Sequence, residues 1–281
     1  MSRLQLVMPM AGRGSRFSRD GFDLPKPLIG IHGKPFFYWA VRSISKYIDC
    51  AGITFVVLQE HVRDFAIDAE IKKYFPDARI TALPEVTEGA AITCLRGVEG
   101  LSNCEPVLFN DCDHLFRCTD FNRFCEEIKF HAGKRDTGTV IGGNIEKDSA
   151  AQTKTLLHCG IPSGPDGALL TFESESPAYS YLEYGNDGEV CRTVEKQVVS
   201  RDAICGAYYF RSRAVFESAC ADYLMNCEYK EYFLSGVYNA LIGAGGTVRG
   251  FRTDFHLPFG IPEEYEEAEK PEKRFMFDEL L

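Results

Sequence analysis

Glycines and cations gather directly after the first expected strand of the chain, residues 4–9. Gly12 and Gly14 follow this strand, where glycines let backbone N–H groups approach a phosphate and form an anion-binding loop. Arg16 and Lys26 can add charge-assisted hydrogen bonds to phosphate oxygens, and a proline on each side of Lys26 fixes a φ angle. The pattern is neither a P-loop nor a dinucleotide fingerprint, because GK[ST] and the third glycine are missing. It indicates a phosphate-binding loop of another kind.

Two carboxylates follow a second apolar stretch, residues 105–109. Asp111 and Asp113 come at the end of this expected strand, and clustered carboxylates suit Mg²⁺, a hard ion that prefers oxygen ligands. The plain alternative is an aspartate that caps the next helix. His114 is more typical of a structural or substrate-side residue than of a catalytic base.

Strand and helix patterns alternate through the first 150 residues. Fully apolar strand patterns of this sort are typical of parallel sheets. The order β-α-β-α favours an α/β fold with a doubly wound, mostly parallel, Rossmann-like sheet. Beyond residues 4–9 we expect strands over residues 52–58, 78–83, 105–109 and 137–145, and helices over residues 36–48, 61–74, 89–101 and 119–132.

The second part of the chain has a different pattern of expected elements, which begins with a hairpin. Residues 179–194 predict a hairpin that turns at Asn186-Asp187-Gly188. We expect further strands over residues 203–210 and 247–253, and helices over residues 212–226 and 231–243. No linker or repeat separates the parts. We therefore expect one domain, 1–281, in which the second half (151–281) adds strands and a subsite to the first (1–150).

Composition limits the classes of partner. The 281 residues carry a net charge of −10, which argues against nucleic acid, and no basic amphipathic stretch suggests a membrane surface. No signal-peptide pattern or membrane span is evident. The 11 cysteines form no CxxC pair, and we expect reduced thiols in a cytoplasmic protein.

Three short motifs stand at fixed spacing: AGRGSRF at residues 11–17, PKPLI at 25–29 and GKP at 33–35. Together they resemble the opening pattern of the sugar-1-phosphate nucleotidyltransferases, also called NDP-sugar pyrophosphorylases, and the resemblance extends over residues 4–268. It implies a GT-A-like fold, a cytoplasmic place in nucleotide-sugar biosynthesis for polysaccharide or capsule, and Mg²⁺ as cofactor. It also implies that Arg16 grips the β- and γ-phosphates, that Lys26 stabilises the α-phosphate and that Asp113 holds the metal.

The resemblance also implies which part of the chain binds each substrate: a nucleotide-binding half (1–150), and an inserted acceptor-binding β subregion and C-terminal helix in the other half (151–281). TEGAAIT at residues 87–93 resembles the family's base-recognition turn, and EK at 195–196 resembles its pair for sugar hydroxyls and acceptor phosphate. The implied nucleotide-binding residues are Met10, Ala11, Gly12, Gly14, Ser15, Glu88, Gly89, Thr93 and Asp111. The implied acceptor-binding residues are Tyr181, Glu195, Lys196, Gly206 and Glu231.

One position departs from the family pattern. Many members carry a second metal aspartate two residues before the glycine of the GTPEDY turn, and Pro258 stands there. Asp254 could replace it only if the strand were rerouted, so one-metal coordination or another carboxylate stays open. The implied reaction joins NMP from a nucleoside triphosphate to a sugar 1-phosphate and releases pyrophosphate.

Three alternatives remain open: a cytidylyltransferase for a non-sugar phosphate or phosphonate, a regulatory homologue without turnover, and a Rossmann-type nucleotide-binding domain. The missing third glycine argues against the last of these. The implied partners are a nucleoside triphosphate and a phosphorylated small-molecule acceptor, and a homo-oligomer is possible.

Overall fold

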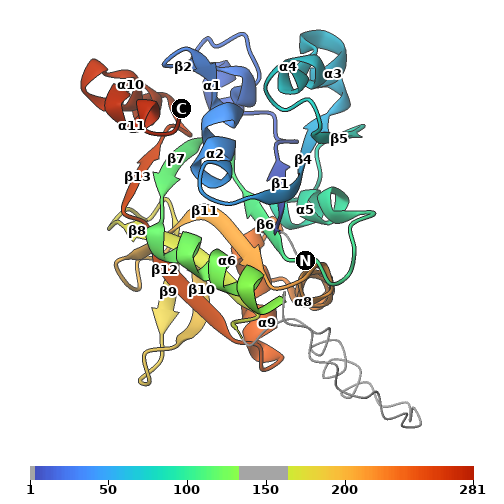
Figure 1. Cartoon of the computed structure of the whole chain (residues 1–281), viewed down its shortest axis with the longest axis vertical. Coiled ribbons are helices and arrows are strands. Elements are labelled where there is room, and N and C mark those ends of the chain that lie inside the picture. The colour runs from blue at the N-terminus through green and yellow to red at the C-terminus, as the bar shows by residue number, and fades with distance from the viewer. Residues whose placement is uncertain (1–3, 133–163) are drawn as a thin grey trace.

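A mixed sheet runs through the middle of the molecule (Figure 1), for which the computed structural model describes residues 4–132 and 164–281. Its strand order is β10-β9-β11-β6-β1-β4-β5, and β8 pairs with β11 and with β12. The strands are β1 (Leu4–Pro9), β4 (Cys50–Leu58), β5 (Arg79–Leu83), β6 (Val107–Asn110), β8 (Gly167–Glu173), β9 (Ser180–Tyr184), β10 (Val190–Glu195), β11 (Asp202–Phe210) and β12 (Val248–Arg252).

The sheet is parallel in its first part and mostly antiparallel in its second. β1 pairs in parallel with both β4 and β6, and β5 pairs in parallel with β4. β11 then joins β6 in antiparallel register, and the hairpin β9–β10 extends the sheet. The mixed α/β fold and the hairpin are confirmed. β8 is not predicted by the sequence, and the strand expected over residues 137–145 lies outside the described residues.

Helices cover both faces of the sheet, as expected for a doubly wound fold (Figure 1). The helices are α1 (Ser15–Arg19), α2 (Phe36–Ser45), α3 (Gln59–Phe65), α4 (Ile67–Tyr74), α5 (Ala90–Val98), α6 (Thr119–Ala132), α8 (Arg213–Asn226), α9 (Leu234–Gly243), α10 (Pro262–Glu269) and α11 (Arg274–Asp278), with 3-10 turns η1 (Lys26–Leu28) and η2 (Pro271–Lys273). Helices α2, α4 and α6 share one core cluster, and α5, α8 and α9 share another.

The alternation of side chains along β1 explains the two cores. Leu6 and Met8 belong to the cluster under α2, whereas Val7, between them, belongs to the cluster under α5. Successive side chains of a strand point to opposite faces, so a strand buried on both sides needs an unbroken apolar run. The predicted helix over residues 61–74 is in fact two helices, because Ala66 has φ +49° and separates α3 from α4.

A third core ties the C-terminal segment to the first part of the chain. It joins Phe17 of α1 and Trp39 of α2 to Phe277 of α11. Two short antiparallel pairs frame it, β2 (Gly30–Ile31) with β3 (Lys34–Pro35) and β7 (His114–Arg117) with β13 (Phe255–Pro258). The β7–β13 pair brings the chain after β13 beside the end of β6. The assignment of one domain with two halves stays a prediction.

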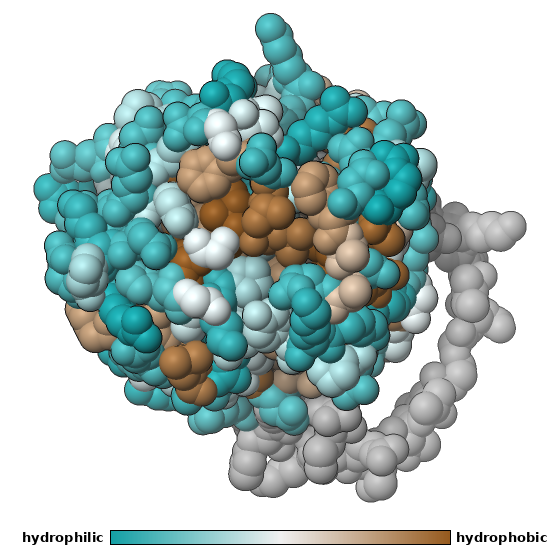
Figure 2. All heavy atoms as spheres, turned by 90° about the horizontal axis from the view of Figure 1, so that it is seen from above, coloured by the Kyte–Doolittle hydropathy of each residue, from teal (hydrophilic) through white to brown (hydrophobic). Residues whose placement is uncertain are grey.

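One face of the molecule combines a hydrophilic rim with a hydrophobic centre (Figure 2). Figure 2 looks onto the end of the molecule that is uppermost in Figure 1 and shows hydrophobic residues gathered in its centre, ringed by hydrophilic ones. Among the described residues, no helix is both long and apolar enough to cross a membrane. Nine cysteines of the described part are free thiols. Cys104 is disulfide-bonded, so the expectation that every thiol is reduced is wrong there.

Candidate active site

The glycine loop and the two aspartates meet because β1 and β6 are parallel neighbours. The carboxyl ends of parallel strands lie at one edge of a sheet, and ligands of open α/β sheets bind beyond that edge. Gly14 has φ +61°, and a Cβ atom added there would lie 2.8 Å from the Cβ of Lys26. Glycine at this position therefore provides both the left-handed backbone and the close approach of η1 to the loop.

A cavity of about 220 Å³, here called the loop cavity, lies between these segments. It is lined by Pro9, Met10, Gly12, Gly14, Lys26, Pro27, Asp111, Cys112 and Asp113. Six residues that the sequence predicts for binding or catalysis thus share one cavity. Two other predicted residues of the loop do not line this cavity: Ala11 is buried in the core under α5, and Ser15 is exposed at the start of α1.

Lys26 and Asp113 form an ion pair at the base of this cavity. The Lys26 ammonium donates to Asp113 Oδ2 at 2.7 Å, and about a quarter of each side chain is exposed. Burial lowers the pKa of Lys26, but the charge of Asp113, its hydrogen bond and the further charge of Asp111 together outweigh burial, and the pKa is raised. Burial likewise raises the pKa of Asp113, but the Lys26 charge and the hydrogen bonds to Asp113 together leave it below its ordinary value. Both groups are therefore charged at neutral pH.

Asp111 is the carboxyl group of the acidic pair that is harder to ionise. Burial, and then the charge of Asp113, raise the pKa of Asp111 to about 7, against the smaller opposing effect of Lys26. One ammonium group thus balances two carboxylates. The surplus negative charge, carried by oxygen ligands, fits a hard divalent cation such as Mg²⁺.

We expect Asp111→Asn to raise the melting temperature of the metal-free protein at pH 8 by at least about 2 °C. A carboxyl whose folded pKa is raised to about 7 destabilises the fold once it ionises, and this penalty grows as the pH rises from about 4 to about 7. At pH 5 the difference should be clearly smaller than at pH 8, because the folded Asp111 is still protonated there and only the unfolded one has ionised. Thermal unfolding at both pH values measures it.

Asp254→Asn is the matched control with the opposite sign. Asp254 Oδ2 accepts hydrogen bonds from Arg117 and Thr119, and these outweigh burial and lower its pKa. A carboxylate of this kind stabilises the fold above its unfolded pKa, so its loss should lower the melting temperature at pH 8. Equal shifts of Asp111→Asn at pH 5 and pH 8 would contradict the assignment of surplus charge to Asp111.

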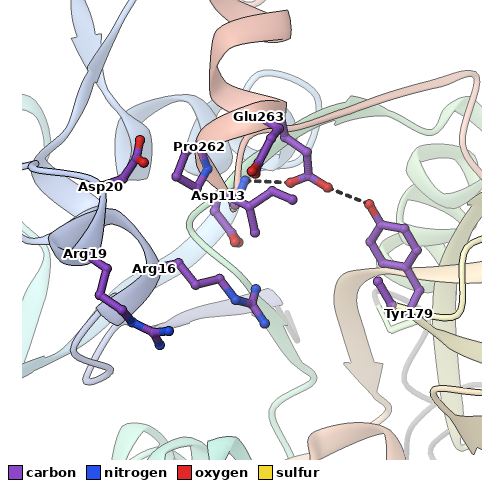
Figure 3. A pocket seen from close by; sticks show the side chains of 11 residues that line it. Arg16, Arg19, Asp20, Asp113, Tyr179, Pro262 and Glu263 are labelled. Carbon is purple, nitrogen blue, oxygen red and sulfur yellow. Dashed lines mark hydrogen bonds between the residues drawn. The ribbon is translucent and has the colours of Figure 1, made fainter.

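Arg16 reaches a second, larger pocket that also touches Asp113. This Arg16 pocket has a volume of about 500 Å³ and is lined by Arg16, Arg19, Asp20, Asp113, Ala178, Tyr179, Gly260, Ile261, Pro262, Glu263 and Glu264. Figure 3 shows the guanidinium of Arg16 extending into the pocket from α1, with Tyr179 on the opposite wall. The predicted cations and the predicted metal aspartate therefore lie on the same side of the molecule.

A third cavity, the Gly206 cavity, has a volume of about 190 Å³. It is lined by Asp111, Asp113, His114, Ala178, Tyr179, Ser180, Ile204, Cys205, Gly206, Tyr208, His256, Pro258, Gly260 and Glu264. Asp113 thus lines all three cavities. The pairing of β11 with β8 shifts register between Ile204 and Tyr208, and a bulge of this kind is common beside active sites.

We expect Gly206→Ala to lower kcat/KM by about 100-fold, because a displacement of about 1 Å at reacting groups has this effect. Gly206 has φ +93°, and an added Cβ would lie 2.7 Å from Asp111 Oδ2, so the carboxylate must move. Gly188→Ala is the control: its φ is +82°, but nothing lies within 4 Å of its added Cβ. Both variants should lose about 1–3 kcal/mol of unfolding free energy, and only Gly206→Ala should lose activity.

Of the predicted acceptor residues, only Gly206 lines the Gly206 cavity, and Glu195 is linked to it through Ser180. The Glu195 carboxylate accepts hydrogen bonds from Ser180 and Ser235, and Ser180 lines the cavity. Lys196 follows with φ +55°, its ammonium 3.8 Å from Glu195. Tyr181, by contrast, is buried and donates to the carbonyl oxygen of Ser176. The expected contact of Tyr181 with the acceptor does not fit this position, and Tyr179 lines the cavity instead.

The TEGAAIT turn contacts the segment before α9. Tyr232 N donates to Glu88 O, and Ala91 N donates to Tyr232 O. A Cβ added to Gly89 would lie 2.5 Å from the backbone of Tyr232. This glycine is therefore needed for the packing of the two segments, whether or not it also contacts a nucleobase. Thr93 is buried and hydrogen-bonded to Thr87.

Two acidic side chains flank this contact. Glu88 and Glu231 are both exposed; Glu88 takes part in this contact through its carbonyl oxygen, and Glu231 directly precedes Tyr232. They lie outside the linings of the three cavities. Their proposed contacts with nucleotide and acceptor stay predictions.

The C-terminal segment supplies groups that the sequence does not single out. Pro258 pairs with His114, and Asp254 is held by Arg117, so neither gives a second metal carboxylate. Glu264 takes a place on this wall, accepting from Gly260 N at 2.9 Å and from the Tyr179 hydroxyl at 2.8 Å (Figure 3). The pattern GIPEEY contains this acid, but only the β7–β13 pairing reveals that it faces Asp113.

Comparison with known proteins identifies the fold. No protein-family model and no curated protein matches the chain. A nucleoside-diphosphate-sugar pyrophosphorylase from Vibrio cholerae RC9 is 21% identical with a TM-score of 0.69, over 94% of this chain and 99% of that one. The inositol-1-phosphate CTP transferase from T. maritima is 12% identical with a TM-score of 0.67, over 99% and 96%.

A third similar structure holds a nucleotide analogue. HddC from Yersinia pseudotuberculosis, complexed with GMP-PN, is 18% identical with a TM-score of 0.59, over 95% of this chain and 98% of that one. At these identities the likeness concerns the fold alone. The fold is the one that the sequence resemblance implies.

Proposed function

We propose that this chain, which shares its fold with an NDP-sugar pyrophosphorylase and a CTP transferase, is a nucleotidyltransferase that joins NMP from a nucleoside triphosphate to a sugar 1-phosphate. One observation carries the proposal. Asp113 lines the loop cavity, the Arg16 pocket and the Gly206 cavity at once, so two phosphorylated substrates can meet beside it. Pyrophosphate and an NDP-sugar are the products.

The loop cavity and the Arg16 pocket suit the nucleoside triphosphate. Backbone amides at Gly12 and Gly14 approach its phosphates, Lys26 donates to the α-phosphate and Arg16 to the β- and γ-phosphates. The acceptor phosphate oxygen attacks the α-phosphorus in line, the bond to the β-phosphate oxygen breaks, and pyrophosphate leaves. A phosphate monoester is already ionised at pH 7, so no general base is needed. Orientation and fixed positive charge supply the catalysis.

Mg²⁺ fits the acidic edge of the site. The surplus of carboxylate over ammonium at Asp111, Asp113 and Lys26 is the observation that favours it, and Glu264 offers a further oxygen ligand. Asp113 would hold the ion, with Asp111 and Glu264 beside it. When bound, a divalent cation neutralises phosphate charge and orients the two substrates. Lys26, released from Asp113, then donates to the triphosphate.

The Gly206 cavity suits the acceptor. Ser180, oriented by Glu195, and Tyr179, oriented by Glu264, present hydroxyl groups at its wall, and Gly206 leaves room beside Asp111. Lys196 adds a cation next to Glu195 for the acceptor phosphate. These assignments place substrate selection in the second half of the chain.

A second candidate is a cytidylyltransferase that uses a non-sugar phosphate or phosphonate. The absence of an aspartate at Pro258 and the likeness to an inositol-1-phosphate CTP transferase favour it. In either case the product would enter a pathway such as polysaccharide or capsule biosynthesis, in the cytoplasm.

A matrix of substrates tests the proposal. The purified chain is mixed with Mg²⁺, one nucleoside triphosphate at a time and a panel of sugar 1-phosphates and non-sugar phosphates, and pyrophosphate release is measured. We expect release only where one triphosphate and one acceptor are both present. A sugar 1-phosphate as the acceptor supports the first candidate, and a non-sugar phosphate supports the second. Nucleotide binding without release in any combination would instead support a regulatory homologue.

A further inference from the structure

Three side chains of the metal-ligand type converge in the wall of the Gly206 cavity. His114 of β7, Cys205 of β11 and His256 of β13 each offer one ligand atom, and these atoms lie within 4.8 Å of one another. His114 and Cys205 are buried, with 2% and 6% of their surface exposed. The phosphoryl transfer proposed above uses none of the three.

The hydrogen bonds of Asn110 fix the protonation of His114. Asn110 Nδ2 donates to the carbonyl oxygen of Ala40 at 3.0 Å, which orients the amide and turns Oδ1 toward His114. His114 Nε2 must then donate to Oδ1, at 3.1 Å, so Nδ1 of the neutral ring is an acceptor. A histidine held in this way through its other nitrogen is a typical metal ligand.

The lone pair of His114 faces His256. Nδ1 of His114 and Nε2 of His256 are 3.3 Å apart. Two imidazole nitrogens bound to one tetrahedral ion at about 2.0–2.1 Å would be separated by about 3.3 Å. These two nitrogens share one hydrogen bond, which His256 Nε2 donates, and Nδ1 of His256 is buried with no hydrogen-bond partner among the described residues.

We propose that His114, Cys205 and His256 bind a divalent transition-metal ion, such as Zn²⁺, in the wall of the Gly206 cavity. Two imidazoles and a thiolate are nitrogen and sulfur donors, which select zinc or cobalt over Mg²⁺. Binding releases the Cys205 proton to solvent. Three protein ligands leave a fourth position, and it opens into the cavity, where an oxygen of the ligand that occupies the cavity can take it.

This site is distinct from the Mg²⁺ site, which has oxygen donors. The metal binding does not rest on the proposed function. Only the identity of the fourth ligand rests on the proposed function, because that proposal assigns the Gly206 cavity to the acceptor.

Cobalt spectroscopy tests the proposal without turnover. The reduced, metal-free full chain is titrated with Co²⁺ in the presence of Mg²⁺. We expect a thiolate-to-cobalt charge-transfer band and the visible bands of four-coordinate cobalt, saturating at one equivalent and lost on addition of Zn²⁺. Cys205→Ser should remove the charge-transfer band. His256→Gln should weaken Co²⁺ binding by at least about 10-fold.

Matched variants keep the test decisive. Cys220→Ser changes another buried cysteine, and His61→Gln changes another buried histidine with an unpartnered Nδ1. Both should leave the spectrum intact. If Cys205→Ser does not fold, His256→Gln alone decides. A missing band, or a band unchanged in the folded variants, overturns the metal site, whereas failure of pyrophosphate release bears only on the transferase.

Discussion

Lys26→Met is expected to lower kcat by at least about 100-fold while the protein stays folded. Lys26 is the cation that the structure places between the glycine loop and Asp113, where its ammonium lies 2.7 Å from Asp113 Oδ2. Loss of one preorganised electrostatic contact to the transition state costs about 100- to 1000-fold in kcat. Steady-state pyrophosphate release with the best substrate pair measures the change, and thermal unfolding checks the fold.

Lys34→Met provides the control for this result. Lys34 belongs to the same sequence pattern, but its ammonium lies over the rings of Tyr38 and Tyr74 and lines none of the three cavities. It should keep kcat within a few-fold of the wild-type value. Normal turnover by Lys26→Met would remove Lys26 from the reaction.

Asp113→Asn is expected to lower kcat by a similar factor of at least about 100, and to remove most of the response of the rate to Mg²⁺. Asp113 lines all three cavities and is the ionised carboxylate of the pair, because burial raises its pKa but the charge of Lys26 and the hydrogen bonds to Asp113 together lower it further than burial raises it. Asparagine keeps the shape but loses the charge that a hard cation needs. Rates over a range of Mg²⁺ concentrations give the measurement.

Asp254→Asn serves as the comparison for metal dependence. This aspartate is the one that the sequence offers near the missing second carboxylate, yet it bonds to Arg117 and Thr119. The Mg²⁺ dependence of its rate should match that of the wild type. An Asp113→Asn enzyme with unaltered Mg²⁺ dependence would show that the metal is held elsewhere.

The glycine loop could be predicted because its chemistry is local. Gly12, Gly14 and Lys26 lie within 15 residues of one another, and a strand that ends at a glycine fixes where the loop opens. Asp111 and Asp113 could be added because β6 is a parallel neighbour of β1, which the alternation of strands and helices implies. Their separation from Lys26 in sequence did not matter, since both strands end at one edge.

The acceptor side could be predicted only in part, because it depends on pairings between distant short strands. Tyr181 shows the difficulty. Adjacent side chains of a strand point to opposite faces of the sheet. Because Ser180 lines the cavity, the side chain of Tyr181 points into the core. Tyr179, just before the strand, reaches the cavity instead. Glu264 and His256 arrive through the pairing of β13 with β7, two four-residue strands without a clear periodic pattern.

The prediction of one continuous helix over residues 61–74, which rested on local propensity, is wrong. Ala66 favours helix on propensity, so nothing in residues 61–74 signals the break between α3 and α4. Its left-handed φ of +49° is set by the packing of the two helices and not by its own preference. Tertiary contacts overrode propensity there.

A crystal structure with a non-hydrolysable nucleoside triphosphate and Mg²⁺ tests the central claim most directly. We expect one triphosphate that touches Arg16, Lys26 and the Gly12–Gly14 loop, with its metal about 2.1 Å from a carboxylate oxygen of Asp113. A triphosphate bound away from this edge of the sheet, or a metal that does not touch Asp113, would contradict it.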